Sequence, residues 1–305
     1  MTSEGEGRFH IMDVSSLTSG PRRAMLRTAD GVPIEAVHEP FPAGVPTPGT
    51  GTGTGATDTP SASAATAPVS APAPATAPVS ALADTAVVVA HGFTGSLDRP
   101  AVRRAAQVLG RHAAAVVTFS FRGHGGSGGL STVGDREVLD LAAAVRWARE
   151  LGHARVVTVG FSMGGSVVLR QAALDRGTDA APDAVAAVSA PARWYYRGTA
   201  PMRRLHWVVT RPVGRLVGRY GLRVRIDRRA WDPVPLSPVE AAARIAPIPL
   251  LVVHGDRDAY FPLDHPRTLA AAGGAELWLE HGMGHAENAA GEDLLDRLGA
   301  WLVPR

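Results

Sequence analysis

Six short apolar runs, separated by segments of helical character, constrain this 305-residue chain more than any other feature of its sequence. The runs lack the alternating polar residues of a half-exposed strand, which is typical of strands buried on both faces. Because helices between successive strands make the strands parallel, the sequence predicts an α/β protein with a doubly wound, mostly parallel sheet. The runs span residues 85–92, 114–123, 154–162, 183–191, 248–256 and 275–282.

The N-terminal quarter differs from the rest in composition. Residues 1–23 are polar and aperiodic, so we expect a disordered N-terminus. Residues 24–42 contain two short apolar runs around Asp30-Gly31, a dipeptide that favours a tight turn, and they predict a β-hairpin. Residues 43–83 consist of Gly-Thr and Ala-Pro-Val-Ser repeats. Such repeats bury too little side chain to offset the entropy of ordering their backbone, and they predict a low-complexity linker.

Residues 192–242 interrupt the alternation of strands and helices, so the core is expected at 84–191 and 243–305. Between Arg193 and Arg229 there are eleven arginines and a single acid, Asp227. All 31 basic residues of the chain are arginine, which reflects a general replacement of lysine but does not explain the scarcity of acids here. Two interpretations remain open. The segment is either a solvated amphipathic surface, or it attracts an anionic substrate, an acyl carrier or an acidic membrane surface.

Reactive side chains follow three of the predicted strands. Ser162 lies in Gly-Phe-Ser-Met-Gly, which fits the pattern G-x-S-x-G between a buried strand and a helix. Asp258 follows the strand at 248–256, and His285 lies just beyond the last predicted strand. In doubly wound sheets, functional groups collect at the carboxyl ends of the strands. The chain order serine, acid, histidine is the order expected of one hydrolase architecture.

These motifs resemble those of α/β-hydrolase-fold serine hydrolases, in particular the esterases and the S33-like peptidases. The resemblance covers residues 85–191 and 245–305, and the hairpin would supply the first two strands of the core. An α/β-hydrolase usually carries its cap where residues 192–242 lie, so the resemblance implies that this segment is a cap insertion. The resemblance rests on HGFTGS, FRGHGGS, GFSMGG, GDRD with Pro262 following, and GMGH, in this order.

The resemblance also implies a role for each motif residue. Ser162 would attack a carbonyl carbon, His285 would accept and later return the proton, and Asp258 would fix the tautomer of the histidine. The backbone N–H groups of Phe93 and Met163 would form the oxyanion hole.

Several residues have competing interpretations. Asp256 precedes Asp258 by two residues and could be the acid or could structure the turn. His281 and His285 are four residues apart like a zinc pair, but glycines between them disfavour the helix that would align the two rings.

A further competing motif lies after the second of the six runs. Gly123, Gly125 and Gly128 satisfy G-x-G-x-x-G after a strand, but a lone match away from the first strand of the fold is a weak sign of a dinucleotide site.

We therefore predict a serine hydrolase that cleaves a carboxylic ester or a related acyl bond through an acyl-enzyme, without a cofactor or a metal. The substrate is expected to be a small acyl compound, and an anionic one would fit the second interpretation of the arginines. Nucleic acid is not expected, because no recognised binding module accompanies the charge. Three alternatives remain: an aminopeptidase or amidase of the S33-like group, a hydrolase-like protein that binds a ligand without turning it over, and a cofactor-free haloperoxidase or perhydrolase that would use the same three residues.

Composition narrows the chemistry and the compartment. The chain has no cysteine, which removes disulfides, thiolate nucleophiles and cysteine-ligated metals. No run of eighteen apolar residues occurs, and the first thirty residues lack the apolar run of a signal peptide. We accordingly expect a cytoplasmic protein without a transmembrane segment, in which membrane contact would be limited to a weak surface contact through the arginine-rich insertion.

Overall fold

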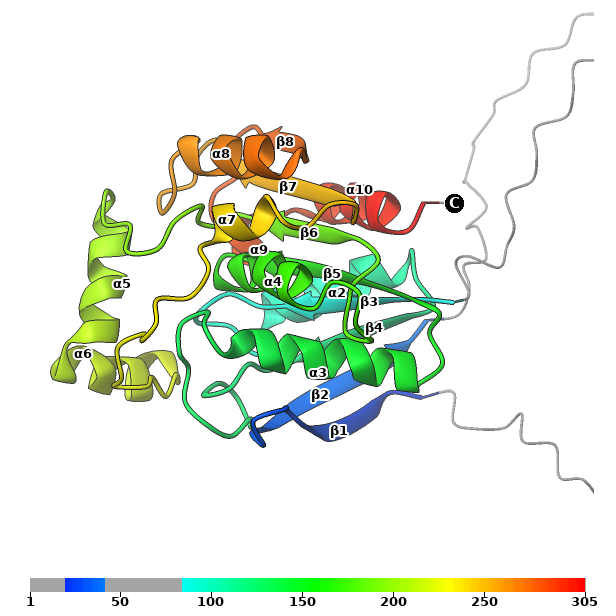
Figure 1. Ribbon diagram of the computed structural model, residues 1–305, viewed down its shortest axis with the longest axis horizontal. Helices are drawn as coiled ribbons and strands as arrows, with labels where there is room; N and C mark the ends of the chain where they lie inside the picture. Colours follow the sequence, from blue (N-terminus) through cyan, green and yellow to red (C-terminus); the bar gives the residue numbers. More distant parts are fainter. Residues whose placement is uncertain (1–19, 42–83, 305) are drawn as a thin grey trace, which may run out of the picture.

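The computed structural model describes residues 20–41 and 84–304, and these form one eight-stranded sheet with helices on both faces (Figure 1). The strand order is β1-β2-β4-β3-β5-β6-β7-β8. Strands β3 to β8 run parallel, and β2 is antiparallel to both of its neighbours. Each of the six predicted apolar runs contains one of the parallel strands, so the doubly wound, mostly parallel sheet is confirmed. The strands are β1 (Arg22–Arg27), β2 (Pro33–Pro40), β3 (Thr85–Ala90), β4 (Ala115–Phe119), β5 (Arg155–Phe161), β6 (Val185–Val188), β7 (Leu250–Gly255) and β8 (Glu276–Glu280).

The helices divide into two layers that bury the two faces of the sheet (Figure 1). On one face lie α3, α4, α7 and α8, and on the other lie α2, α9 and α10. Strand β3 shows why its sequence is an uninterrupted apolar run: Val88 packs in the core on the α3 and α4 side, whereas Val87 and Val89 pack on the α2 and α10 side. The helices are α2 (Pro100–Gly110), α3 (Glu137–Glu150), α4 (Met163–Leu174), α5 (Ala200–Thr210), α6 (Pro212–Val217), α7 (Pro238–Ala242), α8 (Asp264–Gly273), α9 (Ala286–Ala289) and α10 (Glu292–Leu302).

The two N-terminal strands pair antiparallel around a turn at residues 28–32, where Gly31 has a φ of 81°. Strand β1 begins at Arg22, so regular structure starts inside the segment 1–23 for which disorder was predicted. The predicted linker at 43–83, and most of the predicted disordered terminus, lie outside the described residues.

The segment between β6 and β7 contains α5, α6, the π-helical turn η2 (Gly218–Leu222) and α7. Figure 1 shows α5 and α6 projecting beyond one end of the sheet. Helix α7 differs from these, because Ala241 and Ala242 are buried in the core beside α4 and α8. The core therefore resumes at Pro238, a few residues earlier than the predicted boundary at 243. No helix in the described ranges has the length and apolarity needed to cross a membrane.

Candidate active site

Ser162 occupies a sharp turn between β5 and α4. Its φ of 52° and ψ of −111° are rarely adopted by a residue with a side chain, and such strain persists only where the surroundings enforce it. Two glycines permit the turn. A Cβ on Gly160 would collide with the carbonyl of Gly164, and a Cβ on Gly164 would collide with the carbonyl of Ala90. The close approach of strand and helix therefore requires glycine at these two positions of the motif. The turn leaves Ser162 partly exposed.

The imidazole of His285 joins Ser162 to Asp258. Its Nε2 lies 2.8 Å from the hydroxyl Oγ of Ser162, and its Nδ1 lies 2.7 Å from Oδ2 of Asp258. Since the carboxylate can only accept a hydrogen bond, Nδ1 carries the proton and Nε2 is free to accept the proton of the serine hydroxyl. The structure thus brings the three predicted side chains together from segments that are far apart in sequence.

The carboxylate of Asp258 is fully buried and is held by several donors. Besides His285, the backbone N–H groups of Tyr260 and Phe261 donate to Oδ1, at 2.7 and 3.1 Å. Burial alone would raise the pKa of Asp258, but these hydrogen bonds and the nearby imidazole outweigh it, and the pKa lies below its usual value. The acid therefore remains ionised opposite His285.

Tyr260 also fixes the histidine ring directly. Its ring stacks on the imidazole of His285 with centroids 4.2 Å apart and planes inclined by 25°. The stacking restricts rotation of the imidazole and covers part of its surface.

Asp256, the competing acid, contacts a different histidine. Its Oδ2 lies 2.7 Å from Nδ1 of His281, and its Oδ1 accepts the backbone N–H of Gly282. The side chain of His281 is 90% exposed. These contacts brace the surface turn after β8 and leave Asp258 as the carboxylate in contact with His285.

The two predicted oxyanion donors flank Ser162. Phe93 and Met163 both line the same cavity as the serine hydroxyl. Within residues 20–41 and 84–304, neither backbone N–H has a hydrogen-bond acceptor. Met163 also begins α4, whose N-terminal dipole favours negative charge. The backbone of Phe93 is also held through the following peptide, because the carbonyl oxygen of Phe93 lies 2.7 Å from Nε2 of the buried His124.

Glu287 ties the loop of His285 to the loop of Phe93. The residue is 5% exposed, and its carboxylate accepts the backbone N–H of Gly92 at 3.0 Å. The carbonyl of Glu287 in turn accepts a hydrogen bond from Arg104 of α2 at 2.7 Å. The short helix α9 therefore links the histidine, the oxyanion loop and the helical layer behind the sheet.

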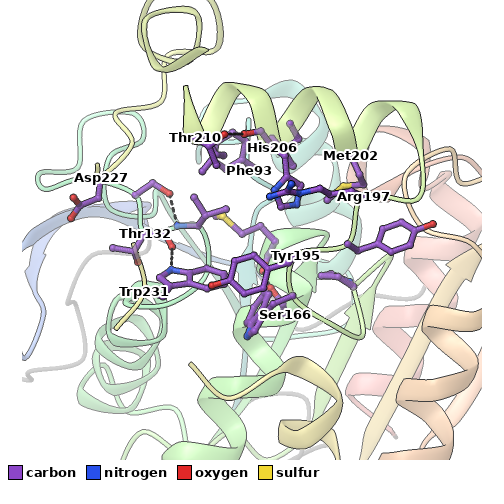
Figure 2. A pocket seen from close by; sticks show the side chains of 18 of the residues that line it. Phe93, Thr132, Ser166, Tyr195, Arg197, Met202, His206, Thr210, Asp227 and Trp231 are labelled. Carbon is purple, nitrogen blue, oxygen red and sulfur yellow. Dashed lines mark hydrogen bonds between the residues drawn. The ribbon is translucent and has the colours of Figure 1, made fainter. Parts of the chain in front are cut away.

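A cavity of about 390 Å³ lies over Ser162 and is bounded by the insertion between β6 and β7. This volume lies within the range of small-molecule sites. Figure 2 shows Met202 and His206 of α5 gathered around the same space as Trp231 and Thr132. The indole Nε1 of Trp231 donates to the carbonyl of Thr132 at 2.7 Å, which connects the end of the insertion to the wall of the core (Figure 2).

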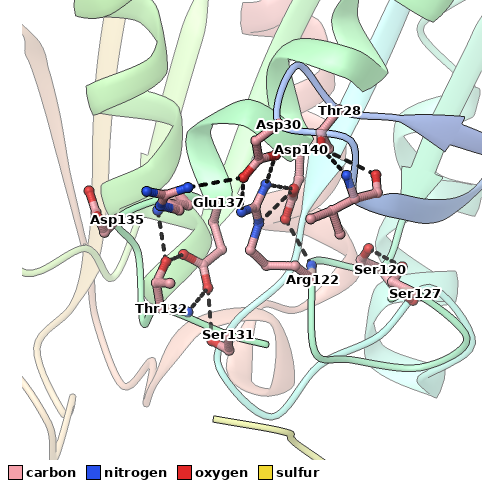
Figure 3. A network of polar contacts seen from close by, with 12 residues as sticks. Thr28, Asp30, Ser120, Arg122, Ser127, Ser131, Thr132, Asp135, Glu137 and Asp140 are labelled. Carbon is pink, nitrogen blue, oxygen red and sulfur yellow. Dashed lines mark hydrogen bonds and ion pairs between the residues drawn. The ribbon is translucent and has the colours of Figure 1, made fainter. Parts of the chain in front are cut away.

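Buried ionic groups hold the loops that form this wall (Figure 3). Both carboxylate oxygens of Glu137 accept hydrogen bonds from the loop at residues 131–134. Nearby, the guanidinium of Arg122 bridges Asp30 of the N-terminal hairpin and Asp140 of α3. The hydrogen bond from Arg122 holds the pKa of Asp30 well below its usual value. The N-terminal hairpin is thereby tied to the loops beside the cavity.

The glycines of the G-x-G-x-x-G match are explained by packing. Gly123 has a φ of 76° and lies where a Cβ would be 2.5 Å from the carbonyl of Arg225. Gly125 and Gly128 lie against Glu35 and Pro33 of β2. This motif therefore connects the core to the insertion and to the N-terminal hairpin.

The chain is similar to several known proteins. Residues 85–195 match the family model of the alpha/beta hydrolase fold. Esterase LipC of Mycobacterium tuberculosis is 31% identical over 183 residues, which cover 53% of this chain and 42% of LipC. The chain therefore aligns with less than half the length of this curated relative.

Solved structures extend the likeness over nearly the whole chain. The esterase Pf2001 of Pyrococcus furiosus has a TM-score of 0.62 at 20% identity, covering 98% of this chain and 97% of Pf2001. The protein XC6422 of Xanthomonas campestris, described as an α/β serine hydrolase without a lid, has a TM-score of 0.56 at 19% identity, covering 95% and 98%. The chain has the α/β-hydrolase fold, and the resemblance inferred from its motifs is confirmed.

Three residues that support the site were not identified from the sequence: Tyr260, Glu287 and Glu137. The only signal in the sequence is proximity, since Tyr260 and Glu287 each lie two residues after a predicted site residue. Glu137 carries no such signal, because acids in the first turn of a helix are ordinarily solvated.

Proposed function

We propose that this protein is a serine hydrolase that cleaves carboxylic esters through an acyl-enzyme. The observation that carries the proposal is the position of the His285 imidazole, 2.8 Å from the Ser162 hydroxyl and 2.7 Å from the Asp258 carboxylate. The esterase names of LipC and Pf2001 support the same reaction class.

In the proposed reaction, Oγ of Ser162 attacks the ester carbonyl carbon while Nε2 of His285 takes the hydroxyl proton. The tetrahedral intermediate collapses as the bond to the leaving alcohol breaks, and His285 gives its proton to that alcohol. Water then attacks the acyl-enzyme and passes a proton to His285, which returns it to Ser162 as the acid is released. Throughout, ionised Asp258 stabilises the imidazolium and keeps its Nδ1 proton in place.

The negative charge of the tetrahedral intermediate would be held by the backbone N–H groups of Phe93 and Met163. Such preorganised donors need no rearrangement when charge develops, which is why they contribute strongly to catalysis. The tie from Glu287 to Gly92 supports this role, because it restrains the residue next to Phe93.

The cavity favours an acyl compound of moderate size with an anionic group. Aromatic and aliphatic side chains cover much of the wall, and five arginines but only one acid, Asp227, are among the described residues that line it. Arg228 and Arg229 are exposed and have no ion-pair partner in the described part of the chain. In this proposal the insertion is a cap that binds the substrate.

The scarcity of acids bears on the aminopeptidase alternative. A peptidase of this kind would need a carboxylate for the ammonium group of its substrate, and Asp227 is the single candidate in the described lining. Its Oδ1 already accepts the backbone N–H of Arg229 at 3.0 Å, and Arg228 and Arg229 follow it directly in the sequence. The surroundings thus favour an ester over a free amine terminus.

Hydrolysis of p-nitrophenyl esters of increasing acyl length tests the proposal. Wild-type protein should release p-nitrophenol with saturation kinetics, whereas Ser162→Ala should reduce kcat by at least about 10⁴-fold while circular dichroism shows an unchanged fold. Folded wild-type protein that turns over none of these esters would favour the non-catalytic binding protein.

A further inference from the structure

Residues 212–222, which form α6 and η2, expose an apolar stripe. Val213, Leu216, Val217 and Tyr220 follow the spacing i, i+3, i+4, i+7, which places four side chains on one helical face. In a globular protein such a face ordinarily packs on the core. Here the four residues are 61, 55, 44 and 75% exposed, respectively.

Another face of the same segment packs closely on its neighbours, and two glycines on that face permit the close approach. A Cβ on Gly214 would collide with the carbonyl of Trp207, and a Cβ on Gly218 would lie 2.9 Å from the side chain of Ile226. Because these glycines allow the close contact with α5 and with the returning chain, the segment cannot rotate its apolar stripe inward without steric overlap. The exposure of the stripe is thus fixed by the packing.

Arginines accompany the stripe at regular spacing in the sequence, and the guanidinium of Arg219 lies 5.7 Å from the ring centroid of Tyr220. Arg211, Arg215, Arg219 and Arg223 are each four residues apart, and Arg204 lies on the neighbouring α5. Arg215 is occupied, since its guanidinium donates to the carbonyls of Val209 and Thr210 at the end of α5. The other four are exposed, and none forms an ion pair within residues 20–41 and 84–304.

Ion pairs are more frequent among the arginines of the core than among those of the insertion. Arg122, Arg146, Arg149, Arg170 and Arg297 each pair with a carboxylate of the described core. Exposed arginines without an ion pair also occur in the described core, as at Arg244 and Arg267, so the arginines near the stripe are distinguished by their position next to exposed apolar side chains. Positive charge is left available beside an exposed apolar surface.

We propose that this outer face of the insertion binds an anionic lipid surface. The outer face comprises Val213, Leu216, Val217 and Tyr220, together with the unpaired arginines Arg204, Arg211, Arg219 and Arg223. An interfacial helix inserts an apolar stripe at the boundary of headgroups and acyl chains, while flanking arginines contact lipid phosphates. The pattern of these eight residues fits both requirements.

A lipid surface fits this face better than an acidic protein does. The stripe lies on a single eleven-residue helical segment at the tip of the molecule, whereas a stable protein interface buries about 800 Å² on each partner around a closely packed centre. Shallow insertion of four side chains into a bilayer needs no such area, and the arginines supply the preference for anionic headgroups.

Docking at this face would also place the proposed catalytic cavity close to the lipid. Leu205 and Val209 of α5 and Arg215 of α6 line the cavity over Ser162 from the inner side of the same helical pair. One helix diameter, about 10 Å, would then separate the cavity from the bound surface. Binding itself requires no catalysis, so it can be tested separately from the proposed hydrolase activity.

Co-sedimentation of the full-length Ser162→Ala protein with vesicles tests the inference, because this variant cannot hydrolyse the lipids. We expect binding to an equal mixture of phosphatidylcholine and phosphatidylglycerol, at least tenfold stronger than to phosphatidylcholine alone and weakened by raising sodium chloride from about 0.1 M to about 1 M. Val213→Ser/Leu216→Ser/Tyr220→Ser and Arg204→Gln/Arg211→Gln/Arg219→Gln should each weaken binding at least tenfold. Arg244→Gln/Arg267→Gln, which removes two exposed and unpaired arginines near the core helices α7 and α8, should leave it unchanged.

Three results would overturn the inference. The first is equal binding to neutral and anionic vesicles, or no binding to either. The second is an equal loss of binding in the Arg244/Arg267 control. The third is coverage of the stripe by another partner. A second copy of the chain would appear as a dimer in sedimentation that Val213→Ser/Leu216→Ser/Tyr220→Ser abolishes, and an acidic protein would be indicated if poly-glutamate bound more tightly than anionic vesicles. Ester hydrolysis by the wild-type protein in solution is measured separately, and its presence or absence leaves these outcomes unaffected.

Discussion

The carboxylate of Glu287 accepts the backbone N–H of Gly92 at 3.0 Å, which joins the segment after His285 to the loop that carries the Phe93 N–H. The proposed proton acceptor and a proposed oxyanion donor are thus positioned relative to each other by one buried contact. Both must be correctly placed at the same time in the proposed transition state, and displacements of about 1 Å are costly to catalysis. Glu287 is accordingly a positioning residue rather than a catalytic one.

Replacing Glu287 should affect turnover more than substrate binding. We expect Glu287→Ala to lower kcat by about 10- to 100-fold with little change in KM, since the loss of one oxyanion donor altogether costs about 100- to 1000-fold. Glu287→Gln retains an oxygen acceptor for Gly92 and should recover most of the activity. A merely structural role would instead lower the melting temperature of both variants equally and leave kcat per folded molecule unchanged.

The two acids after β7 should differ sharply in importance. Asp258→Asn removes the acceptor that holds the Nδ1 proton of His285 and should lower kcat by about 10³- to 10⁴-fold. Asp256→Asn disturbs only the exposed turn at His281 and should retain activity within about threefold. The same ester assay measures both variants, and a larger loss for Asp256→Asn would contradict the assignment of the acid.

The tight turn at Ser162 should not tolerate a methyl group on Gly164, two residues further along the chain. In Gly164→Ala the new Cβ would meet the backbone of Ala90, so we expect a loss of about 3 kcal/mol or more in the free energy of unfolding by urea. Gly221→Ala is the matched control, because its Cβ would meet only a side-chain atom of Val217 at 3.8 Å. If both variants unfold at the same urea concentration as wild type, the close approach of strand and helix is not required.

Stability should fall as the pH is lowered, in part through His91. This side chain is fully buried, its Nε2 accepts the N–H of Phe121, and burial together with the nearby His124 lowers its pKa to about 3. The unfolded chain takes up this proton near pH 6.5, so between about pH 6.5 and pH 3 it binds more protons than the folded state does. The contribution of His91 is complete above pH 6.5 and is lost as the pH falls.

The expected slope from this group is up to about 1.4 kcal/mol per pH unit. Urea unfolding of wild type and His91→Gln at a series of pH values measures it, and the variant should have a slope smaller by about one proton. An identical slope in the two proteins would mean that His91 is protonated in the folded state.

Arginines at the cavity should matter for charged substrates only. Arg228→Gln/Arg229→Gln should raise KM for an anionic ester about three- to tenfold at low salt and leave KM for a neutral ester of the same length unchanged. Added salt should produce the same contrast in wild type. An equal response of both esters would show that the arginines serve solvation rather than recognition.

The sequence predicts those parts of the molecule that depend on local pattern. Unbroken apolar runs such as the one ending at Ala90 predict doubly covered strands, and a glycine on each side of Ser162 predicts a close crossing of strand and helix. The sequence predicts a core boundary at residue 243, later than the structure shows, because the five helical residues of α7 follow a proline-rich stretch and carry little periodic signal.

Contacts between distant segments are harder to predict. The stacking of Tyr260 on His285, and the hydrogen bond of Glu287 to Gly92, depend on how three strand ends meet in space. The stripe at 213–220 has the pattern of a buried helix face, and only the structure reveals that it is exposed.

Covalent labelling tests the central claim most directly. A fluorophosphonate reacts with an activated serine hydroxyl, and mass spectrometry of the digested protein identifies the modified residue. We predict a single adduct on Ser162, formed by wild type at neutral pH, slowed at least about 100-fold in Asp258→Asn and absent in Ser162→Ala. An adduct on another serine, or folded wild-type protein that remains unlabelled, would contradict the assignment of Ser162 as the nucleophile.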